Sequence, residues 1–309
     1  MREKRMSKIL AITGASGKSG SVFCRIISEN VEAVSKMFPG GVRLIMHSDK
    51  PTPLDDTGEL FVTKVLGNLE DEGFVTDALE GVDTLVHIAG IHWSREVAAA
   101  CVKRNVRRLI AVHTTGIYSK YKEAGEEYRH IDDFCYKACK DGNIALTILR
   151  PTMIYGSPYD KNVIKFIKMV DKFPIMPTVN GARYNLQPVH FADLGKAYYD
   201  VLTNESTAGK DYVLSGKEPI MLRDMFTEIG KCLGKKVRFV SVPFWLAYPG
   251  AVVLYFVSLK RIDMREKVQR LCEPRAYSHE DAASDFGYEP RPFSDGIDDE
   301  VKQYLSMKQ

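Results

Sequence analysis

The chain has 309 residues, of which 45% are hydrophobic and 27% are charged, and this length suits roughly two domains. Such a composition excludes disorder, coiled coil and collagen. Lysine and arginine number 43 against 40 aspartate and glutamate residues, so the net charge of +3 predicts no nucleic-acid partner. The basic residues 1–8 lead into a strand pattern without the apolar core and cleavage site of a secretory signal, which favours a cytoplasmic protein.

Short apolar runs alternate with helical stretches up to about residue 150, as in βαβ units that build a parallel sheet. Each run is almost continuously apolar, which is typical of strands covered by helices on both faces. Six strands are predicted at residues 9–13, 42–46, 60–66, 84–88, 109–113 and 146–149. Apolar stripes at helical spacing lie between them, formed by Val22, Phe23, Ile26 and Ile27 and by Phe74, Val75, Ala78 and Leu79. We therefore predict an α/β fold with a doubly wound parallel sheet.

The regular alternation ends near Arg150-Pro151. Residues 151–309 show helical patterns at about 162–172 and 193–203 and a strand-like run at 212–214. We expect residues 1–150 to form one domain and residues 151–309 a smaller substrate-binding region, with the two packed around one cleft.

Residues 244–259 are all apolar or small. This stretch is too short to span a bilayer comfortably, and Pro249-Gly250 interrupts it. It predicts two half-helices, buried or packed on the surface, and no membrane contact is expected. The alternative is an interfacial membrane contact or an oligomer interface, because basic residues follow directly: Lys260, Arg261, Arg265 and Lys267.

The six cysteines are scattered, without a C-x-x-C pair, which predicts neither a disulfide framework nor a zinc cluster. Cys135 and Cys139 are four residues apart on a predicted helix, yet no further ligand lies at metal-binding spacing. We predict that both are buried packing residues and that the chain holds no metal.

A glycine-rich loop with G-x-x-G-x-x-G spacing follows the first predicted strand. Gly14 suits a tight exit from the strand, Gly17 a close approach of the backbone to a pyrophosphate, and Gly20 close packing of the next helix. The N-terminus of that helix then faces the anion. The loop predicts a dinucleotide site formed by Gly14, Ala15, Ser16, Gly17, Lys18, Ser19 and Gly20.

The residues after the second strand bear on the choice of nucleotide. An acidic residue at this strand end bonds the ribose hydroxyls of NAD, whereas a basic residue accommodates the extra phosphate of NADP. The sequence offers both, in His47-Ser48-Asp49-Lys50. His47 and Ser48 at the strand end favour NADP slightly, and a register slip of two residues brings Asp49 to a ribose hydroxyl instead.

Several segments, taken in order, resemble the short-chain dehydrogenase/reductase superfamily in its extended and atypical branches, the NAD-dependent epimerase/dehydratase group. They are the glycine loop and residues 67–71, 82–90, 149–151, 154–156, 189–194 and 286–290. The resemblance covers nearly the whole chain. It implies a Rossmann-type domain that binds NAD(P), with cofactor contacts from Asn68, Leu69, Ala89 and Gly90. It also implies that His190 and Asp193 shape the pocket and cap a helix.

Active members of this superfamily use a Ser or Thr at the end of strand five. Thr114 and Thr115 both fit that position, and Thr115 is the preferred candidate. The resemblance also implies a Tyr-x-x-x-Lys pair one helical turn apart, in which the lysine lowers the pKa of the tyrosine.

Three tyrosines compete for the catalytic position. The pairs are Tyr118 with Lys122, Tyr128 with Asp132, and Tyr136 with Lys140. Counting back from Leu149, the family register selects Tyr128 and places Asp132 where the lysine belongs. A carboxylate there is expected to raise the pKa of the phenol by repulsion.

Two functions follow from these observations. The first is an NAD(P)-dependent oxidoreductase, epimerase or dehydratase that acts on a nucleotide sugar or a similar small substrate, with a carbonyl reductase for apolar substrates as a variant. The second is an NAD(P)-binding redox sensor or scaffold without catalysis. The family also implies a homodimer through helices at about 94–104 and 124–140.

Overall fold

A seven-stranded parallel sheet forms the centre of the computed structural model, which describes residues 8–58, 60–121, 123–173 and 175–308. The basic segment 1–7 lies outside these ranges. The strand order is β11-β6-β5-β4-β1-β2-β3. The doubly wound sheet is confirmed, and the ends of the six predicted strands agree with the structure within two residues. The strands are β1 (Ile9–Thr13), β2 (Val42–Met46), β3 (Val62–Leu66), β4 (Val82–His87), β5 (Arg108–Val112), β6 (Ala145–Pro151) and β11 (Asp211–Leu214).

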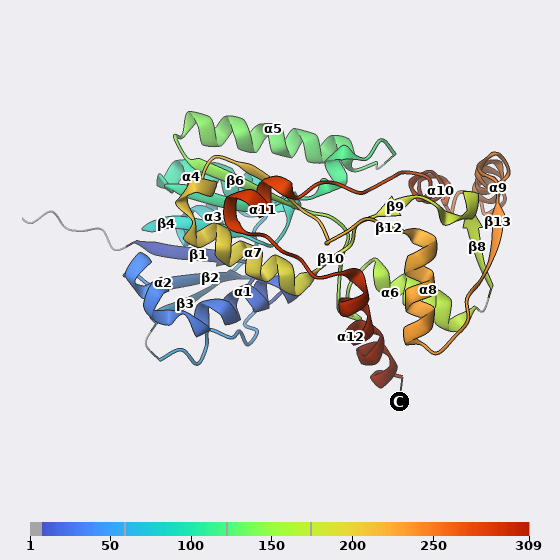
Figure 1. Ribbon diagram of the computed structural model, residues 1–309. Coiled ribbons are helices and arrows are strands. Elements are labelled where there is room, and N and C mark those ends of the chain that lie inside the picture. The colour runs from blue at the N-terminus through green and yellow to red at the C-terminus, as the bar shows by residue number, and fades with distance from the viewer. Residues whose placement is uncertain (1–7, 59, 122, 174, 309) are drawn as a thin grey trace, which may run out of the picture.

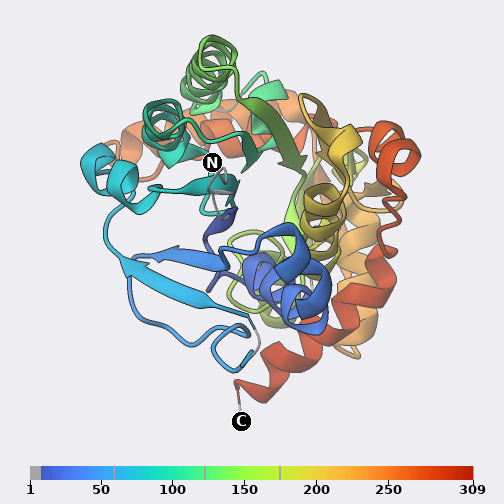
Figure 2. The ribbon, with the colours of Figure 1, turned by 90° about the vertical axis from the view of Figure 1, so that its left-hand side faces the viewer.

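Helices cover both faces of this sheet (Figures 1 and 2). One layer holds α1 (Lys18–Glu29), α2 (Val31–Met37) and α7 (Phe191–Thr203), and the other holds α3 (Glu72–Ala78), α4 (Ser94–Arg104) and α5 (Gly125–Asp141). The predicted stripes supply the buried side chains Phe23, Ile27, Val75 and Leu79. Cys135 and Cys139 lie on α5 and are buried as predicted, and burial raises the pKa of the Cys139 thiol to about 11.

The chain returns to the sheet after residue 150. Helix α7 packs on α1, β11 pairs with β6 as the seventh strand, and α11 (Glu280–Phe286) packs on β11. The predicted division at residue 150 is therefore crossed several times.

The remaining elements form the smaller part of the molecule (Figure 1). Short strand pairs join β7 (Ile154–Tyr155) to β10 (Val189–His190), β9 (Asn185–Leu186) to β12 (Ile220–Met221), and β8 (Ile175–Val179) to β13 (Arg238–Val242). The helices are α6 (Val163–Lys172), α8 (Leu222–Cys232), α9 (Phe244–Val257), α10 (Arg265–Leu271) and α12 (Phe293–Ser306).

The apolar stretch at residues 244–259 forms one helix, α9, at the end of the molecule farthest from the main sheet (Figure 1). The prediction of two half-helices is wrong, because α9 continues through Pro249, and Ala251 is its one buried residue. The proline removes one main-chain hydrogen bond in the second turn, and the rest of the helix is retained. In the described parts of the chain no helix is long and apolar enough to cross a membrane.

Candidate functional site

The predicted cofactor residues gather along the carboxyl edge of the sheet. The sheet order places β4, β1, β2 and β3 side by side. One segment of predicted cofactor-binding residues follows each of these strands at this edge. Ala89 and Gly90 follow β4, the glycine loop follows β1, His47 and Ser48 follow β2, and Asn68 and Leu69 follow β3. Ligands of open α/β sheets bind at this edge, where the connections diverge to opposite faces.

The glycines of the loop are required by close packing. Gly14 has a φ of +75°, and a Cβ atom there lies 2.8 Å from the backbone nitrogen of Ala89. A Cβ atom on Gly20 lies 2.1 Å from the carbonyl oxygen of Gly14. Gly17 precedes α1 and donates its N–H to Gly14. Gly90, with a φ of +112°, faces open space instead, since a Cβ atom meets nothing within 4 Å.

A buried histidine links the residues at the start of the glycine loop to those that follow β4. His87 Nε2 lies 3.1 Å from the carbonyl oxygen of Gly90, so this nitrogen carries the proton and donates it. Thr13 then donates its hydroxyl to Nδ1 at 2.7 Å. Burial, with a smaller effect of His113, lowers the pKa of His87 to about 3, which keeps the ring neutral. This link between β1 and β4 was not predicted, because the sequence does not reveal which strand ends are neighbours.

Residues 47–50, which are predicted to meet the ribose, follow β2 directly, without the register slip of two residues that was considered as an alternative. Strand β2 ends at Met46, so the exposed His47 is the first residue beyond it. The Asp49 carboxylate forms an ion pair with Lys64 Nζ at 3.1 Å, and Lys64 also pairs with Asp55 at 2.9 Å. After β3, the exposed Asn68 accepts a hydrogen bond from the backbone of Glu70 and donates one to the Glu70 side chain.

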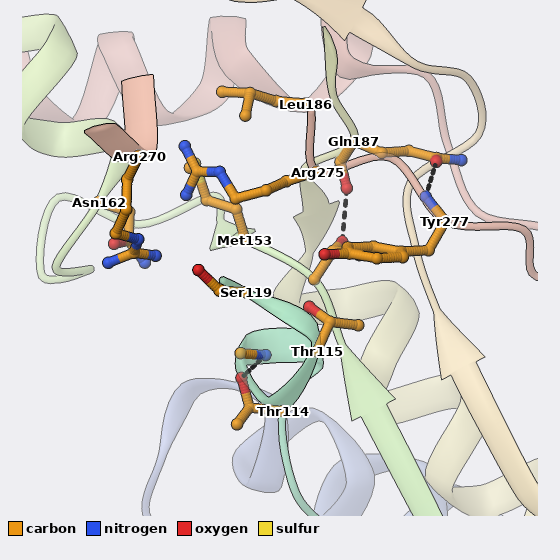
Figure 3. Close-up of a pocket in the computed structure, with 12 residues that line it drawn as sticks. Thr114, Thr115, Ser119, Met153, Asn162, Leu186, Gln187, Arg270, Arg275 and Tyr277 are labelled. Carbon is orange, nitrogen blue, oxygen red and sulfur yellow. Dashed lines mark hydrogen bonds between the residues drawn. The ribbon is translucent and has the colours of Figure 1, made fainter. Parts of the chain in front are cut away.

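A polar cavity of about 190 Å³ lies at the ends of β5 and β6, farther along the same edge. The smaller part of the molecule closes it (Figure 3). Its walls are formed by Thr114, Thr115, Gly116, Ser119, Thr152, Met153, Asn162, Leu186, Gln187, Arg270, Arg275 and Tyr277. The lining residues come from both sides of position 150.

Two arginines extend into this cavity from the side opposite Ser119 (Figure 3). Arg270 forms an ion pair with Glu266 at 3.3 Å, whereas the Arg275 guanidinium has no carboxylate within ion-pair distance among the described residues. The Nε atoms of both are buried without a hydrogen-bond partner there. Burial, then repulsion from Arg270, lowers the pKa of Arg275 to about 10, so it stays charged at neutral pH.

The acidic residue Glu273, whose charge acts on Arg275, already has hydrogen-bond partners. Glu273 accepts hydrogen bonds from Ser119 Oγ at 2.6 Å and from the backbone of Lys120 at 2.7 Å. The cavity therefore offers positive charge and unused N–H groups to an anionic ligand. Sequence reasoning missed both arginines, and the only signal for them was the basic segment after residue 259.

The two candidate threonines differ in their hydrogen bonds. Thr115 donates its hydroxyl to the carbonyl oxygen of Pro151 at 3.2 Å, so its proton is committed to the backbone. Thr114 instead accepts from the N–H of Gly116 at 3.0 Å, which leaves its own proton for a ligand. Both line the cavity, and Thr114 is the better placed to donate a hydrogen bond into it.

Tyr128 lies on α5, buried on the side of the sheet that carries α4. Its ring packs edge-on against His92, and its hydroxyl is 3.4 Å from His92 Nε2. Burial raises the pKa of Tyr128, Glu127 raises it further, and Arg270 opposes both. The predicted repulsion from Asp132 is therefore incorrect, because the carboxylate responsible is that of Glu127.

Asp132 points away from the site. It is 2.5 Å from His113 Nδ1 and forms an ion pair with Arg150 at 2.6 Å, and all three side chains are buried. The position where the family has its lysine thus holds an anion that is bound between α5, β5 and β6.

The other candidate tyrosines have different partners. Tyr136 donates its hydroxyl to Asp211 and accepts a hydrogen bond from Arg150. Tyr118 is half exposed and packs its ring against Tyr277, which lines the cavity. Its predicted partner Lys122 lies outside the described residues.

His190 caps α7 as predicted, since its Nδ1 accepts a hydrogen bond from the N–H of Ala192 at 3.2 Å. Asp193 forms an ion pair with Arg291 at 2.9 Å. These contacts are structural.

No protein-family model matches the chain. Among curated proteins, a 2-alkyl-3-oxoalkanoate reductase of Stenotrophomonas maltophilia is 24% identical over 92% of this chain and 95% of its own length. The N-acetyl-alpha-D-glucosaminyl-diphospho-ditrans,octacis-undecaprenol 4-epimerase of Escherichia coli O157:H7 is 21% identical over 75% of this chain and 81% of that protein.

Solved structures agree over nearly the full length. A UDP-glucuronic acid 4-epimerase from Bacillus cereus has a TM-score of 0.71 at 17% identity, covering 97% of this chain and 99% of its own. A dTDP-glucose 4,6-dehydratase from Streptomyces venezuelae has a TM-score of 0.69 at 18% identity, covering 96% and 97%. The chain shares the Rossmann-type α/β fold of these proteins over nearly its full length. Asp132 departs from the Tyr-x-x-x-Lys pattern that the sequence resemblance implies.

Proposed function

We propose that the chain is an NAD(P)-dependent oxidoreductase of the extended short-chain dehydrogenase type, acting on the hydroxyl or carbonyl group of an anionic substrate. One observation carries the proposal: the glycine loop after β1 and the arginine-lined cavity after β5 share one edge of the sheet. A dinucleotide in the first and a substrate in the second are then neighbours.

The loop fits a dinucleotide. The close packing of Gly14 and Gly20 brings the backbone to the start of α1, whose N–H groups bind a pyrophosphate. The open space beside Gly90 admits the rest of the nucleotide. A bound nicotinamide supplies the site for hydride exchange. His47 and Ser48 donate hydrogen bonds to a 2′-phosphate, which favours NADP slightly, since Asp49 is held by Lys64.

Side chains of the protein supply the proton that the substrate oxygen takes up during reduction. With its pKa raised, Tyr128 stays protonated at neutral pH and donates to an alkoxide that develops on the substrate. His92, exposed and 3.4 Å away, returns a proton from solvent. Thr114 donates a hydrogen bond that orients the reacting oxygen. This arrangement favours reduction of a carbonyl over oxidation of a hydroxyl, because oxidation requires the phenolate.

The arginine pair supports a substrate with a phosphate or a carboxylate. Arg275 presents a planar fork of N–H donors that matches either anion. A nucleotide sugar meets this requirement with its phosphates. The two curated relatives are also named for substrates that carry an anionic group, a diphosphate in one and an alkanoate in the other.

A homodimer remains part of this proposal. Helices α4 and α5 pack side by side at one face of the molecule, where the superfamily forms its four-helix interface. Sedimentation analysis tests this assembly, and a monomer at all concentrations contradicts it.

Calorimetric titration with NAD, NADH, NADP and NADPH tests the cofactor site first. We expect one oxidised and reduced pair to bind, with NADP and NADPH the tighter. Gly17→Asp places a carboxylate against the phosphates and abolishes binding. Ser28→Asp, which adds the same charge near the other end of α1, serves as the matched control and leaves binding intact.

Turnover is tested next with NADPH, a panel of nucleotide sugars and a 3-oxo acid. Product formation that depends on Tyr128 supports the proposal. Cofactor binding without turnover on any substrate establishes the non-catalytic sensor or scaffold instead. Failure of all four nucleotides to bind overturns both functions.

A further inference from the structure

Helix α9 and the residues that follow it expose a continuous apolar surface. No charged residue occurs from 244 to 259. Trp245 is 73% exposed and Leu259 is 78% exposed. We name this the α9 surface, formed by Trp245, Leu246, Val253, Leu254, Phe256, Val257, Leu259 and Ile262.

A helix that is apolar on all sides is normally buried. Here α10 covers part of α9, and most of its large side chains remain in solvent. An exposed apolar surface of this extent indicates a site of contact with another protein or with a membrane. The helix has 14 residues and is about 21 Å long at 1.5 Å per residue, so it lies along an apolar layer and does not cross one.

Positive charge borders this surface on its C-terminal side. Residues 260–267 contain four basic and two acidic side chains, a net charge of +2. Asp263 pairs with Arg265, and Glu266 pairs with Arg270. Lys260 and Arg261 are exposed and form no ion pair with any described residue.

We propose that the α9 surface docks the protein on an anionic lipid surface. The apolar side chains enter the boundary between headgroups and acyl chains, and Lys260 and Arg261 bind the anionic headgroups. Trp245 is suited to this boundary, because an indole has an apolar body and one polar N–H. The sequence led us to expect no membrane contact, and the exposure of α9 replaces that expectation.

The charge next to the helix argues for lipid over a second copy of the chain. A symmetric contact through the α9 surface offers no acidic partner to Lys260 and Arg261, because residues 244–259 of a second copy carry no charge. An anionic lipid surface supplies the missing negative charge. The inference does not depend on the reaction proposed above.

Docking also has a geometric consequence for the site. Helix α10 packs on α9, and Arg270 in its last turn lines the cavity. A protein held by α9 therefore keeps its cavity close to the lipid.

Sedimentation of the full chain with vesicles tests the proposal. We expect binding to vesicles of phosphatidylcholine with phosphatidylglycerol, and weaker binding to phosphatidylcholine alone. Trp245→Glu weakens binding to both by roughly tenfold or more, since it removes apolar area and adds a repelled charge. Phe61→Glu, at a side chain 71% exposed in the Rossmann half, is the matched control and leaves binding unchanged.

The basic residues are tested separately. Neutralising Lys260 and Arg261 together, as Lys260→Gln with Arg261→Gln, removes about 1 kcal/mol for each residue and so lowers affinity for anionic vesicles about thirtyfold. Binding to neutral vesicles is expected to stay the same. Lys36→Gln on α2 is the matched control.

Fluorescence locates the helix in the lipid. The chain has two tryptophans, Trp93 and Trp245, so Trp93→Phe leaves Trp245 as the only indole. We expect its emission to move to shorter wavelength on anionic vesicles and to be quenched by brominated acyl chains. Unchanged emission with no sedimentation overturns the proposal. A dimer that Trp245→Glu dissociates, in a protein that ignores vesicles, assigns the α9 surface to a second copy.

Discussion

Asp132 on α5 lies 2.5 Å from His113 Nδ1 at the end of β5, and both side chains are buried. Arg150 of β6 completes the cluster through its ion pair with the same carboxylate. One turn of α5 separates Asp132 from Tyr128, and that spacing places a lysine beside the tyrosine in active superfamily members. In this chain the position instead ties α5 to two strands.

Asp132→Asn is therefore expected to act on stability. Removing one partner leaves the Arg150 guanidinium buried with less compensation, which costs about 3 kcal/mol or more of unfolding free energy. Urea denaturation measures the loss. Asp211→Asn removes the other carboxylate bound by Arg150, at a side chain that is 40% exposed, and is expected to cost about 1 kcal/mol or less. Equal losses in the two variants contradict this account.

Tyr128→Phe is expected to separate catalysis from binding. Loss of the proton donor lowers kcat about a hundredfold or more, with cofactor affinity unchanged in calorimetry. Tyr136→Phe at the other end of α5 is the control and leaves kcat intact, because its hydroxyl binds Asp211 and Arg150. A tyrosine whose pKa is raised above its ordinary value of 10.0 keeps its proton through neutral pH. Reduction is therefore expected to be flat from pH 6 to 9, and a fall in kcat within that range excludes Tyr128 as the donor.

The sheet and the glycine loop could be predicted because they depend on local patterns. Apolar runs mark strands that are covered on both faces, and Gly14 and Gly20 mark a loop in which a Cβ atom has no room. The strand β11 was harder to place, since four residues at 211–214 carry little signal and their partner β6 lies some sixty positions earlier.

The substrate side could not be predicted for a physical reason. Spacing places Tyr128 and Asp132 on one helix face, yet it does not show that His113 and Arg150 bind the carboxylate. Arg275 reaches the cavity from an irregular segment. Such a segment has no helix or strand periodicity from which the direction of a side chain could be predicted. The sequence left open whether residues 244–259 are buried or packed on the surface, because composition reports how apolar a helix is and not whether the chain covers it.

Arg275→Gln is expected to raise KM for an anionic substrate about tenfold or more, because it removes hydrogen bonds to the charged group of the substrate. The value of kcat is expected to change little, because that group is distant from the reacting atoms. Arg261→Gln, on the surface after α9, is the matched control. Urea denaturation separates binding from structure: a half-buried guanidinium whose Nε has no partner among the described residues gives the fold little, so the variant keeps its stability. A large loss of stability with unchanged KM shows a structural role instead.

His47→Ala tests the nucleotide preference. We expect affinity for NADPH to fall about tenfold, because a hydrogen bond to a phosphate is lost, and affinity for NADH to stay the same. Asp49→Asn is expected to change neither, since Lys64 already holds that carboxylate. Calorimetry measures all four affinities. A gain of NADPH affinity in Asp49→Asn shows that Asp49 meets the ribose after all.

Glu300 on α12 gives stability an unusual pH dependence. Its side chain is fully buried and accepts a hydrogen bond from the N–H of Gly156 at 2.7 Å. Burial and the neighbouring Asp160 raise the pKa of Glu300 from 4.5 to about 9. The folded state thus holds a proton that the unfolded state releases. The stability from this group is complete below pH 4.5 and is lost as the pH rises toward 9.

Glu300→Gln keeps the shape and removes the titration. The unfolding free energy of the variant, measured in urea, is expected to rise relative to that of the natural chain. The difference grows by about 1.4 kcal/mol for each pH unit between 5 and 8. The same substitution at the exposed Glu29 is the matched control. A difference between Glu300→Gln and the natural chain that stays constant across this range means that Glu300 is ionised in the fold. Its buried carboxylate then requires a cation that no described residue supplies.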